Sequence, residues 1–126
     1  FGSYNSNIGT IYFLKGDYEK SYLYFKKAFQ IDSTIQDYMN NIASYFGTIG
    51  EYNLSIYWSK RSLKLGKFKS SNLEALNSLQ ISYGYLKKKK KVKYYRKLYN
   101  KESKKYVELT ENNNCECTKP ICILEK

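Results

Sequence analysis

Large apolar side chains recur every three or four residues along most of this chain. Near its start, Ile8, Ile11 and Tyr12 lie at positions i, i+3 and i+4, which places them on one face of a helix. Gly16 and Asp17 interrupt the pattern, as expected for the turn that ends a helix. A second stripe follows, made of Tyr18, Tyr22, Phe25, Ala28 and Phe29. Strand-like alternation is missing from the sequence, so the pattern predicts an all-α fold.

The apolar pattern also repeats itself. One constant shift along the chain superposes Ile8 on Ile42, Gly9 on Ala43, Tyr12 on Phe46, Gly16 on Gly50, Tyr18 on Tyr52 and Ser21 on Ser55. A fixed displacement of this kind, about 34 residues long, is typical of stacked repeats in which each repeat is one supersecondary unit. The sequence therefore predicts a helical-repeat solenoid of about three helix–turn–helix units.

The spacing and residue types resemble the tetratricopeptide repeat (TPR), a helix–turn–helix unit of about 34 residues. The first repeat, residues 2–35, departs from the family pattern at Ser21 and Ser33, where Ala and Pro are usual. The second, residues 36–69, departs at Ser59, where a bulky aromatic is preferred. The resemblance implies a right-handed superhelix whose first helices line a concave groove.

A third unit, residues 73–105, matches less closely. Leu76, Leu79 and Tyr83 fit its first helix, and the second can be lined by Val92, Tyr95 and Leu98. Lysines stand where the turn glycine and the following tyrosine are expected, and the connection before this unit is longer than the repeat period requires. We therefore expect one repeat domain over residues 1–109, followed by a loop or disordered tail over residues 110–126.

The resemblance also implies where a partner binds. Transferring the groove positions of the family residue by residue gives three sets, one for each first helix: Ser6, Thr10 and Phe13; Asp37, Asn40, Ser44 and Thr48; and Asn77, Ile81 and Tyr85. Some family members clamp a terminal carboxylate with basic residues on these helices, which this chain lacks there. A groove for a helix or an extended segment stays open.

The net charge of +11 is concentrated in one segment. Residues 86–105 carry 11 Lys or Arg against one acid, whereas residues 1–85 carry nine against six. The basic patch consists of Lys87, Lys88, Lys89, Lys90, Lys91, Lys93, Arg96 and Lys97. Such a block can attract phosphates, anionic lipid or an acidic peptide, and the interleaved Tyr94, Tyr95 and Tyr99 can stack on bases. The alternative is a solvated outer face of a terminal repeat.

Catalytic and metal-binding patterns are missing from the sequence. It contains no His, no Gly-flanked nucleophile turn and no phosphate-binding Gly-rich loop. Its three cysteines, Cys115, Cys117 and Cys122, can share a soft metal ion, but a structural zinc site needs four ligands. We therefore expect a chain that is not an enzyme, holds no cofactor and has no catalytic or metal site.

These observations favour a non-catalytic protein–protein interaction module, a scaffold or adaptor, that binds a peptide or helix in its groove. Two alternatives stay open: a sensory or regulatory segment of a larger bacterial signalling protein, and nucleic-acid or anionic-surface association through the Lys-rich third repeat. The chain opens on Phe1 inside an expected helix, so we expect a piece of a larger protein or a processed form. We expect no membrane span and a cytoplasmic location, although cysteine usage fits either redox environment, and the oligomeric state stays open.

Overall fold

The computed structural model describes the backbone of residues 1–115 and the side chains of residues 1–105. This part of the chain forms six α-helices and contains no strand. The helices are α1 (Gly2–Leu14), α2 (Tyr18–Ile31), α3 (Gln36–Thr48), α4 (Tyr52–Leu65), α5 (Lys69–Tyr85) and α6 (Lys89–Cys115). The all-α prediction is confirmed for these residues.

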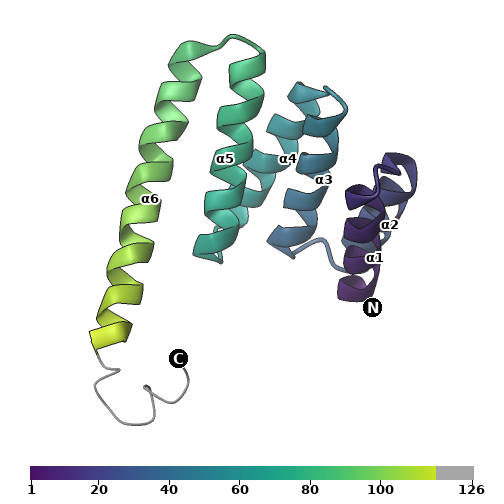
Figure 1. The fold of residues 1–126 in the computed structure, drawn as a ribbon, viewed down its shortest axis with the longest axis horizontal. Coiled ribbons are helices and arrows are strands. Elements are labelled where there is room, and N and C mark those ends of the chain that lie inside the picture. Colours follow the sequence, from purple (N-terminus) through teal and green to yellow (C-terminus); the bar gives the residue numbers. More distant parts are fainter. Residues whose placement is uncertain (116–126) are drawn as a thin grey trace.

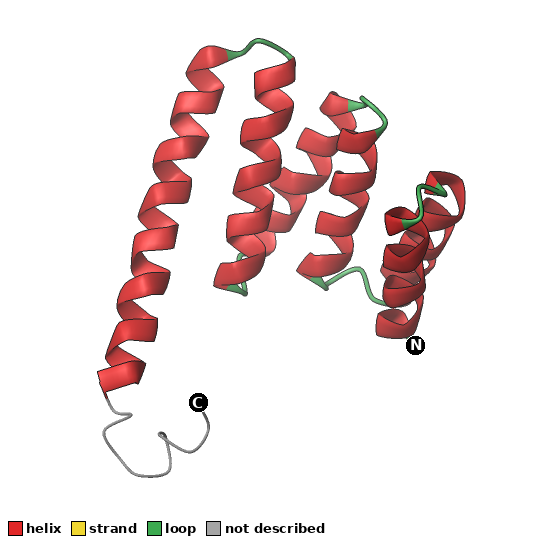
Figure 2. Cartoon of the chain, in the orientation of Figure 1, coloured by secondary structure: helices red, strands yellow, loops and turns green. Residues whose placement is uncertain are grey.

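The helices pair in sequence order into three hairpins: α1 with α2, α3 with α4, and α5 with α6. The hairpins lie in one row with α1 and α6 towards its opposite ends (Figure 1), and short loops join the helices (Figure 2). Neighbouring hairpins meet through α2 with α3 and α4 with α5. The first helices also contact one another in turn, α1 with α3 and α3 with α5, and so form one layer.

All three hairpin turns share one pattern of backbone hydrogen bonds. In each, the residue that precedes the second helix donates its N–H to a carbonyl near the end of the first helix. The bonds run from Asp17 N to Tyr12 O (2.9 Å), from Glu51 N to Phe46 O (2.8 Å) and from Lys88 N to Tyr83 O (2.9 Å). Donor and acceptor are separated by the same number of residues in every case, so the third hairpin repeats the local geometry of the first two.

Each of these turns needs one residue in the left-handed region of backbone space. Glycine occupies this position in the first two turns, with φ of +82° at Gly16 and +84° at Gly50. Lys87 takes it in the third turn, at φ +58°. A side chain at such a φ costs about 1–2 kcal/mol, because Cβ approaches the neighbouring carbonyl oxygen. The third turn therefore keeps its shape against the preference of its residue.

Aromatic rings fill the joint between the first two hairpins. The ring of Tyr22 on α2 stacks on Tyr45 of α3 at 4.5 Å and meets Phe46 edge-on at 5.4 Å. Phe29 of α2 meets Trp58 of α4 edge-on at 5.0 Å. Such pairs contribute about 0.5–1.5 kcal/mol beyond the area that they bury. The repeat position held by Phe46 thus lies between helices, as the sequence pattern predicts.

The second joint combines an apolar cluster with a buried amide. Ile56 of α4 packs with four residues of the third hairpin, Leu76, Leu79, Tyr83 and Tyr95. Beside this cluster, Gln36 is 1% exposed and uses both ends of its amide. Its Nε2 donates to Ser62 O (3.0 Å) and to Asn72 Oδ1 (2.8 Å), and its Oε1 accepts from Phe68 N (2.9 Å). One side chain therefore links the start of α3 to the end of α4 and the start of α5.

Two boundaries differ from the sequence prediction. α5 begins at Lys69, not at residue 73, so the extra residues form an additional N-terminal turn of this helix instead of a longer connection. Gln36 fixes the backbone just before that turn by accepting from Phe68 N. At the other end, α6 runs to Cys115, so the predicted tail begins inside a helix. The rest of that tail, residues 116–126, lies outside the described part.

Candidate binding groove on the first helices

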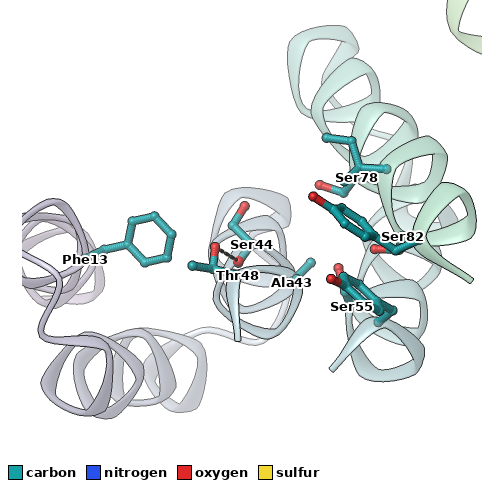
Figure 3. A pocket seen from close by; sticks show the side chains of 11 residues that line it. Phe13, Ala43, Ser44, Thr48, Ser55, Ser78 and Ser82 are labelled. Atoms are coloured by element: carbon teal, nitrogen blue, oxygen red, sulfur yellow. Dashed lines mark hydrogen bonds between the residues drawn. The ribbon is translucent and has the colours of Figure 1, made fainter. Parts of the chain in front are cut away.

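The layer of first helices carries a hollow of about 470 Å³. α1, α3 and α5 provide its walls, and two residues of α4 complete its lining. Figure 3 shows Phe13 projecting from α1 towards Thr48 of α3, with Ser78 and Ser82 on α5 across the space. The lining residues are Phe13, Ala43, Ser44, Gly47, Thr48, Tyr52, Ser55, Ser78, Ile81, Ser82 and Tyr85. The hollow therefore spans all three hairpins.

Packed aromatic rings flank this hollow on both sides. On the α1 side, the Phe13 ring lies edge-on to Tyr18 at 5.3 Å and near Phe25 at 6.3 Å. On the α5 side, the ring of Tyr85 stacks on Tyr52 of α4 at 4.7 Å with an interplanar angle of 4°. Tyr85 is nevertheless 65% exposed. Both apolar contact surfaces are thus held in place before any ligand arrives.

The middle of the hollow is lined by small side chains, several of which carry a hydroxyl group. A Cβ added at Gly47 would lie 3.3 Å from Ser55 Oγ, so α3 and α4 approach closely here. The Thr48 hydroxyl donates to Ser44 O at 2.8 Å, within its own helix. Its oxygen keeps the capacity to accept a hydrogen bond. The floor of the hollow is therefore made of small residues with a few polar groups.

Five of the ten predicted groove residues line this hollow, namely Phe13, Ser44, Thr48, Ile81 and Tyr85. Two others join helices instead. Ser6 is buried and accepts from Asn41 Nδ2 at 2.9 Å, and Asn40 is 3% exposed with Nδ2 donating to Ser71 O at 3.0 Å. For these two residues, the structure places the side chain between first helices and not in an open groove.

The remaining three predicted residues are exposed but lie outside the hollow. Thr10 donates its hydroxyl to Ser6 O, and Asn77 faces solvent on α5. Asp37 accepts from the Ser71 hydroxyl at 2.6 Å. Asp37 precedes Ser44 by two helical turns on α3, which is about 10 Å along the helix axis. It therefore lies beyond one end of the hollow.

That end of the layer is acidic. Glu74 of α5 accepts from Asn40 Nδ2 at 3.4 Å, and Asp37 lies near enough to act on its charge. Partial burial raises the pKa of the Glu74 carboxyl above its ordinary value, and the charge of Asp37 adds to this increase. Two carboxylates that repel each other favour a cation beside them. The layer thus presents an aromatic hollow at one end and an acidic pair at the other.

The sequence pattern did not predict the lining residues with small side chains, nor the lining residues that belong to α4. Ala43 and Gly47 lie on the same helix as the predicted Ser44 and Thr48, one position away in each case. The repeat register offered a signal for Gly47, because the shift that relates the first two repeats superposes Phe13 on it. No such signal pointed to Tyr52, whose ring reaches the hollow by stacking on Tyr85.

The basic patch surrounds a second hollow of about 530 Å³ at the turn between α5 and α6. Five of its eight predicted residues line this space, namely Lys87, Lys88, Lys89, Lys93 and Arg96, together with Gly84 and Val92. The three tyrosines that the sequence suggested for base stacking differ in their exposure to solvent. Tyr95 is 8% exposed and Tyr99 packs on the core, whereas Tyr94 is 55% exposed. Packing in the α5–α6 joint buries Tyr95 and covers part of Tyr99.

The described side chains include no group of three His, Cys, Asp or Glu residues placed to hold a metal ion. The predicted tail cysteines Cys117 and Cys122, and the side chain of Cys115, lie outside the described part. Within residues 1–115, no helix combines the length and the apolar character needed to cross a bilayer.

Comparisons with known proteins assign neither a family nor a function to the chain. No protein-family model matches the chain, and no curated protein shows significant similarity to it. The interpretation of the groove therefore depends on its own residues.

Proposed function

We propose that this chain is a protein-interaction module of the tetratricopeptide type, which binds a peptide or helix of a partner in the hollow along α1, α3 and α5. In this proposal the module is non-catalytic and acts as a scaffold or adaptor. The observation that carries it is the hollow of about 470 Å³ that spans three hairpins. The repeat period and the three matching turns support the repeat architecture, in which such a layer is the binding face.

The apolar contact surfaces support a binding role because they are exposed and already positioned. Ile81 and Tyr85 line the hollow at 50% and 65% exposure, although large apolar side chains gain from burial. The stack of Tyr85 on Tyr52 restricts the ring that a partner contacts. Little side-chain freedom is then lost on binding, which favours affinity.

The charges of the groove define the partner's chemistry. Asp37 lies about 10 Å along α3 from Ser44, which lines the hollow, and Glu74 lies beside Asp37; the residues that line the hollow include no Lys or Arg. A complementary partner carries a large apolar residue for the hollow and a Lys or Arg for the acidic pair. A separation of about 10 Å corresponds to about three residues of an extended peptide or about seven of a helix.

The test is selection of a random peptide library on the full chain, followed by dissociation constants for the selected peptides from fluorescence anisotropy. We expect the enriched peptides to pair a basic residue with a large apolar one at those spacings. Thr48→Lys places a long side chain with a charged end in the hollow. It is expected to weaken binding at least about tenfold, because the ammonium group must be desolvated when a partner binds. Asp37→Asn is expected to weaken it a few-fold, since the exposed pair contributes about 1 kcal/mol.

The matched control is Gln30→Lys, which adds the same charge at an exposed position of α2 outside the hollow. Its affinity is expected to equal that of the unmodified chain. The proposal fails if selected peptides bind the Thr48→Lys chain as tightly as the control. It also fails if selection yields no peptide that the folded chain binds.

A further inference from the structure

A row of cations lines the solvent face of α6. Lys90, Lys93, Lys97, Lys101 and Lys104 follow one another at three- or four-residue spacing, and all are exposed. This spacing places them on one helix face over about 21 Å. The single acid of residues 86–105, Glu102, is half-buried and lies towards the opposite side. The row is therefore a continuous positive surface.

The adjoining turn adds a basic hollow to this row. Five cations surround Gly84 and Val92 in the space of about 530 Å³ described above. Among residues 1–105, the one ion pair within 4 Å joins Lys20 and Asp17, far from this turn in the sequence. The cations around the hollow thus have no carboxylate partner among the described side chains, and an external anion can neutralise them.

The first two hairpins have acidic residues at the place where the third hairpin has lysines. Asp17 and Glu51 directly precede α2 and α4, and Asp17 accepts from Lys20 N at 3.3 Å. Lys88 holds the equivalent place before α6, and Lys89 to Lys91 follow it. Cations at the start of a helix are unfavourable because the helix dipole is positive there. This repulsion adds to the demand of the basic hollow and the lysine row for an anion.

An aromatic ring lies within the positive surface. Tyr94 is 55% exposed, four residues after Lys90 and three before Lys97, so its ring stands beside both on the helix surface. Its edge-on contact with the buried Tyr95, at 5.0 Å and 83°, restricts the ring. A restrained aromatic ring between lysines suits a ligand that alternates phosphates with flat bases.

The apolar side of α6 narrows the choice of ligand further. Val92, Tyr95, Leu98 and Tyr99 pack against the core formed with α5. Helices that lie in a membrane interface bury a free apolar face in the lipid, whereas the apolar face of α6 up to residue 105 is packed against the core. An acidic peptide matches the lysines but lacks a regular series of flat rings for Tyr94.

We propose that the outer face of α6 and the α5–α6 turn bind single-stranded nucleic acid. The lysine row contacts successive phosphates, the basic hollow accepts a further phosphate, and Tyr94 stacks on a base. This surface is separate from the proposed peptide groove, since the two hollows share no lining residue. Either surface can therefore fail its test without affecting the other.

The experiment uses the full chain and a fluorescein-labelled oligouridine of about 20 nucleotides, with anisotropy measured between about 50 and 200 mM KCl. Each phosphate contact contributes about 0.7 to the slope of log affinity against log salt for single strands. For four phosphate contacts, the affinity is expected to fall about 50-fold between the lowest and the highest salt concentration. The triple change Lys90→Gln, Lys93→Gln and Lys97→Gln is expected to lower that slope by about 2.

Two matched controls distinguish an effect of this site from an effect of net charge and from the loss of any exposed tyrosine ring. The triple change Lys15→Gln, Lys64→Gln and Lys67→Gln removes the same charge from exposed positions outside the third hairpin and is expected to keep the slope. Tyr94→Ala is expected to weaken binding at least about fivefold through lost stacking. Tyr57→Ala, at 54% exposure on α4, is expected to have no effect.

Helicity by circular dichroism checks that each variant is folded. The proposal is overturned if the α6 triple variant keeps the full slope, if both triple variants lose it equally, or if Tyr94→Ala binds like the unmodified chain. Vesicles of phosphatidylcholine and phosphatidylserine, mixed at about two to one, provide the membrane arm. Adsorption to these vesicles at protein concentrations that leave the oligonucleotide unbound would replace the nucleic-acid proposal with a lipid one.

Discussion

The second and third hairpins turn the chain in the same way with opposite kinds of residue. Gly50 and Glu51 form the turn between α3 and α4, whereas Lys87 and Lys88 form the one between α5 and α6. The backbone bonds to Phe46 and Tyr83 have nearly the same length, at 2.8 and 2.9 Å. The shape of the turn is therefore set by the two helices that it joins and not by its own residues, which in the third hairpin carry positive charge.

The buried positions of α4 and α5 differ as well. Along α4, the buried positions include Ser55, Ser59 and Ser62, each at most 1% exposed. Along α5 they include Leu76 and Leu79, which belong to the apolar cluster. Small side chains let helices approach closely but bury little apolar area, whereas leucines contribute about 1.5–3 kcal/mol each. The buried positions of α5 therefore contribute more apolar burial than the buried serines of α4.

The largest expected effect tests this contrast between α4 and α5. Leu79→Ala removes a fully buried side chain from the cluster and is expected to lower the free energy of unfolding by about 2–5 kcal/mol. Ser59→Ala, at an equally buried position whose Oγ has no hydrogen-bond partner among the described side chains, is expected to be neutral or slightly stabilising. Urea unfolding followed by circular dichroism measures both. Equal losses for the two variants would remove the distinction between α4 and α5.

The next effect concerns the amide that joins the two hairpins. Gln36→Ala leaves Phe68 N and Asn72 Oδ1 without their partner and opens space beside Ser62. We expect a loss of about 1–3 kcal/mol, the cost of burying unsatisfied polar groups. Asn53→Ala, on the exposed surface of α4, is the control and is expected to change stability little. A Gln36→Ala chain as stable as this control would show that the amide does not hold α5.

A smaller effect compares the two turns directly. Lys87→Gly relieves a left-handed side chain but makes the unfolded chain more flexible, so a net gain of about 0.5–1 kcal/mol is expected. Gly50→Lys creates the same strain in the second turn and is expected to cost a similar amount. Thermal and urea unfolding of both variants give the two values. Changes of the same sign would contradict the equivalence of the turns.

The smallest effect is a pH dependence at the acidic end of the groove layer. Because burial and Asp37 raise the pKa of Glu74 in the folded state, the folded chain binds more protons than the unfolded chain just above the ordinary value of 4.5. This group's contribution to stability therefore falls as pH rises through that window. Glu74→Gln is expected to remove that loss and to stabilise the chain at pH 7 by less than about 1 kcal/mol. Parallel pH profiles for the two chains between pH 4 and 7 would contradict the assignment.

The sequence predicted the helices of the first two hairpins closely because apolar stripes, glycine turns and the repeat shift agree there. It predicted the third turn in spite of its lysines, since Tyr83 stands in register with Tyr12 and Phe46. It missed the extra turn of α5, which depends on the distant Gln36 amide that accepts from Phe68 N. Of the groove residues, Phe13 and Tyr85 follow from register, whereas the burial of Ser6 and Asn40 follows from contacts between first helices that no local pattern encodes.

The proposed function depends on a third hairpin that continues the row in the same register, so that α5 completes the hollow begun by α1 and α3. The stack of Tyr52 on Tyr85, at 4.7 Å between ring centres, exists in this arrangement of α4 and α5. Nuclear Overhauser spectra of the tyrosine rings, assigned with Tyr52→Phe and Tyr85→Leu chains, test it directly. We expect cross-peaks between these two rings that disappear in the Tyr85→Leu chain. A folded chain without those cross-peaks would contradict the packing on which the groove depends.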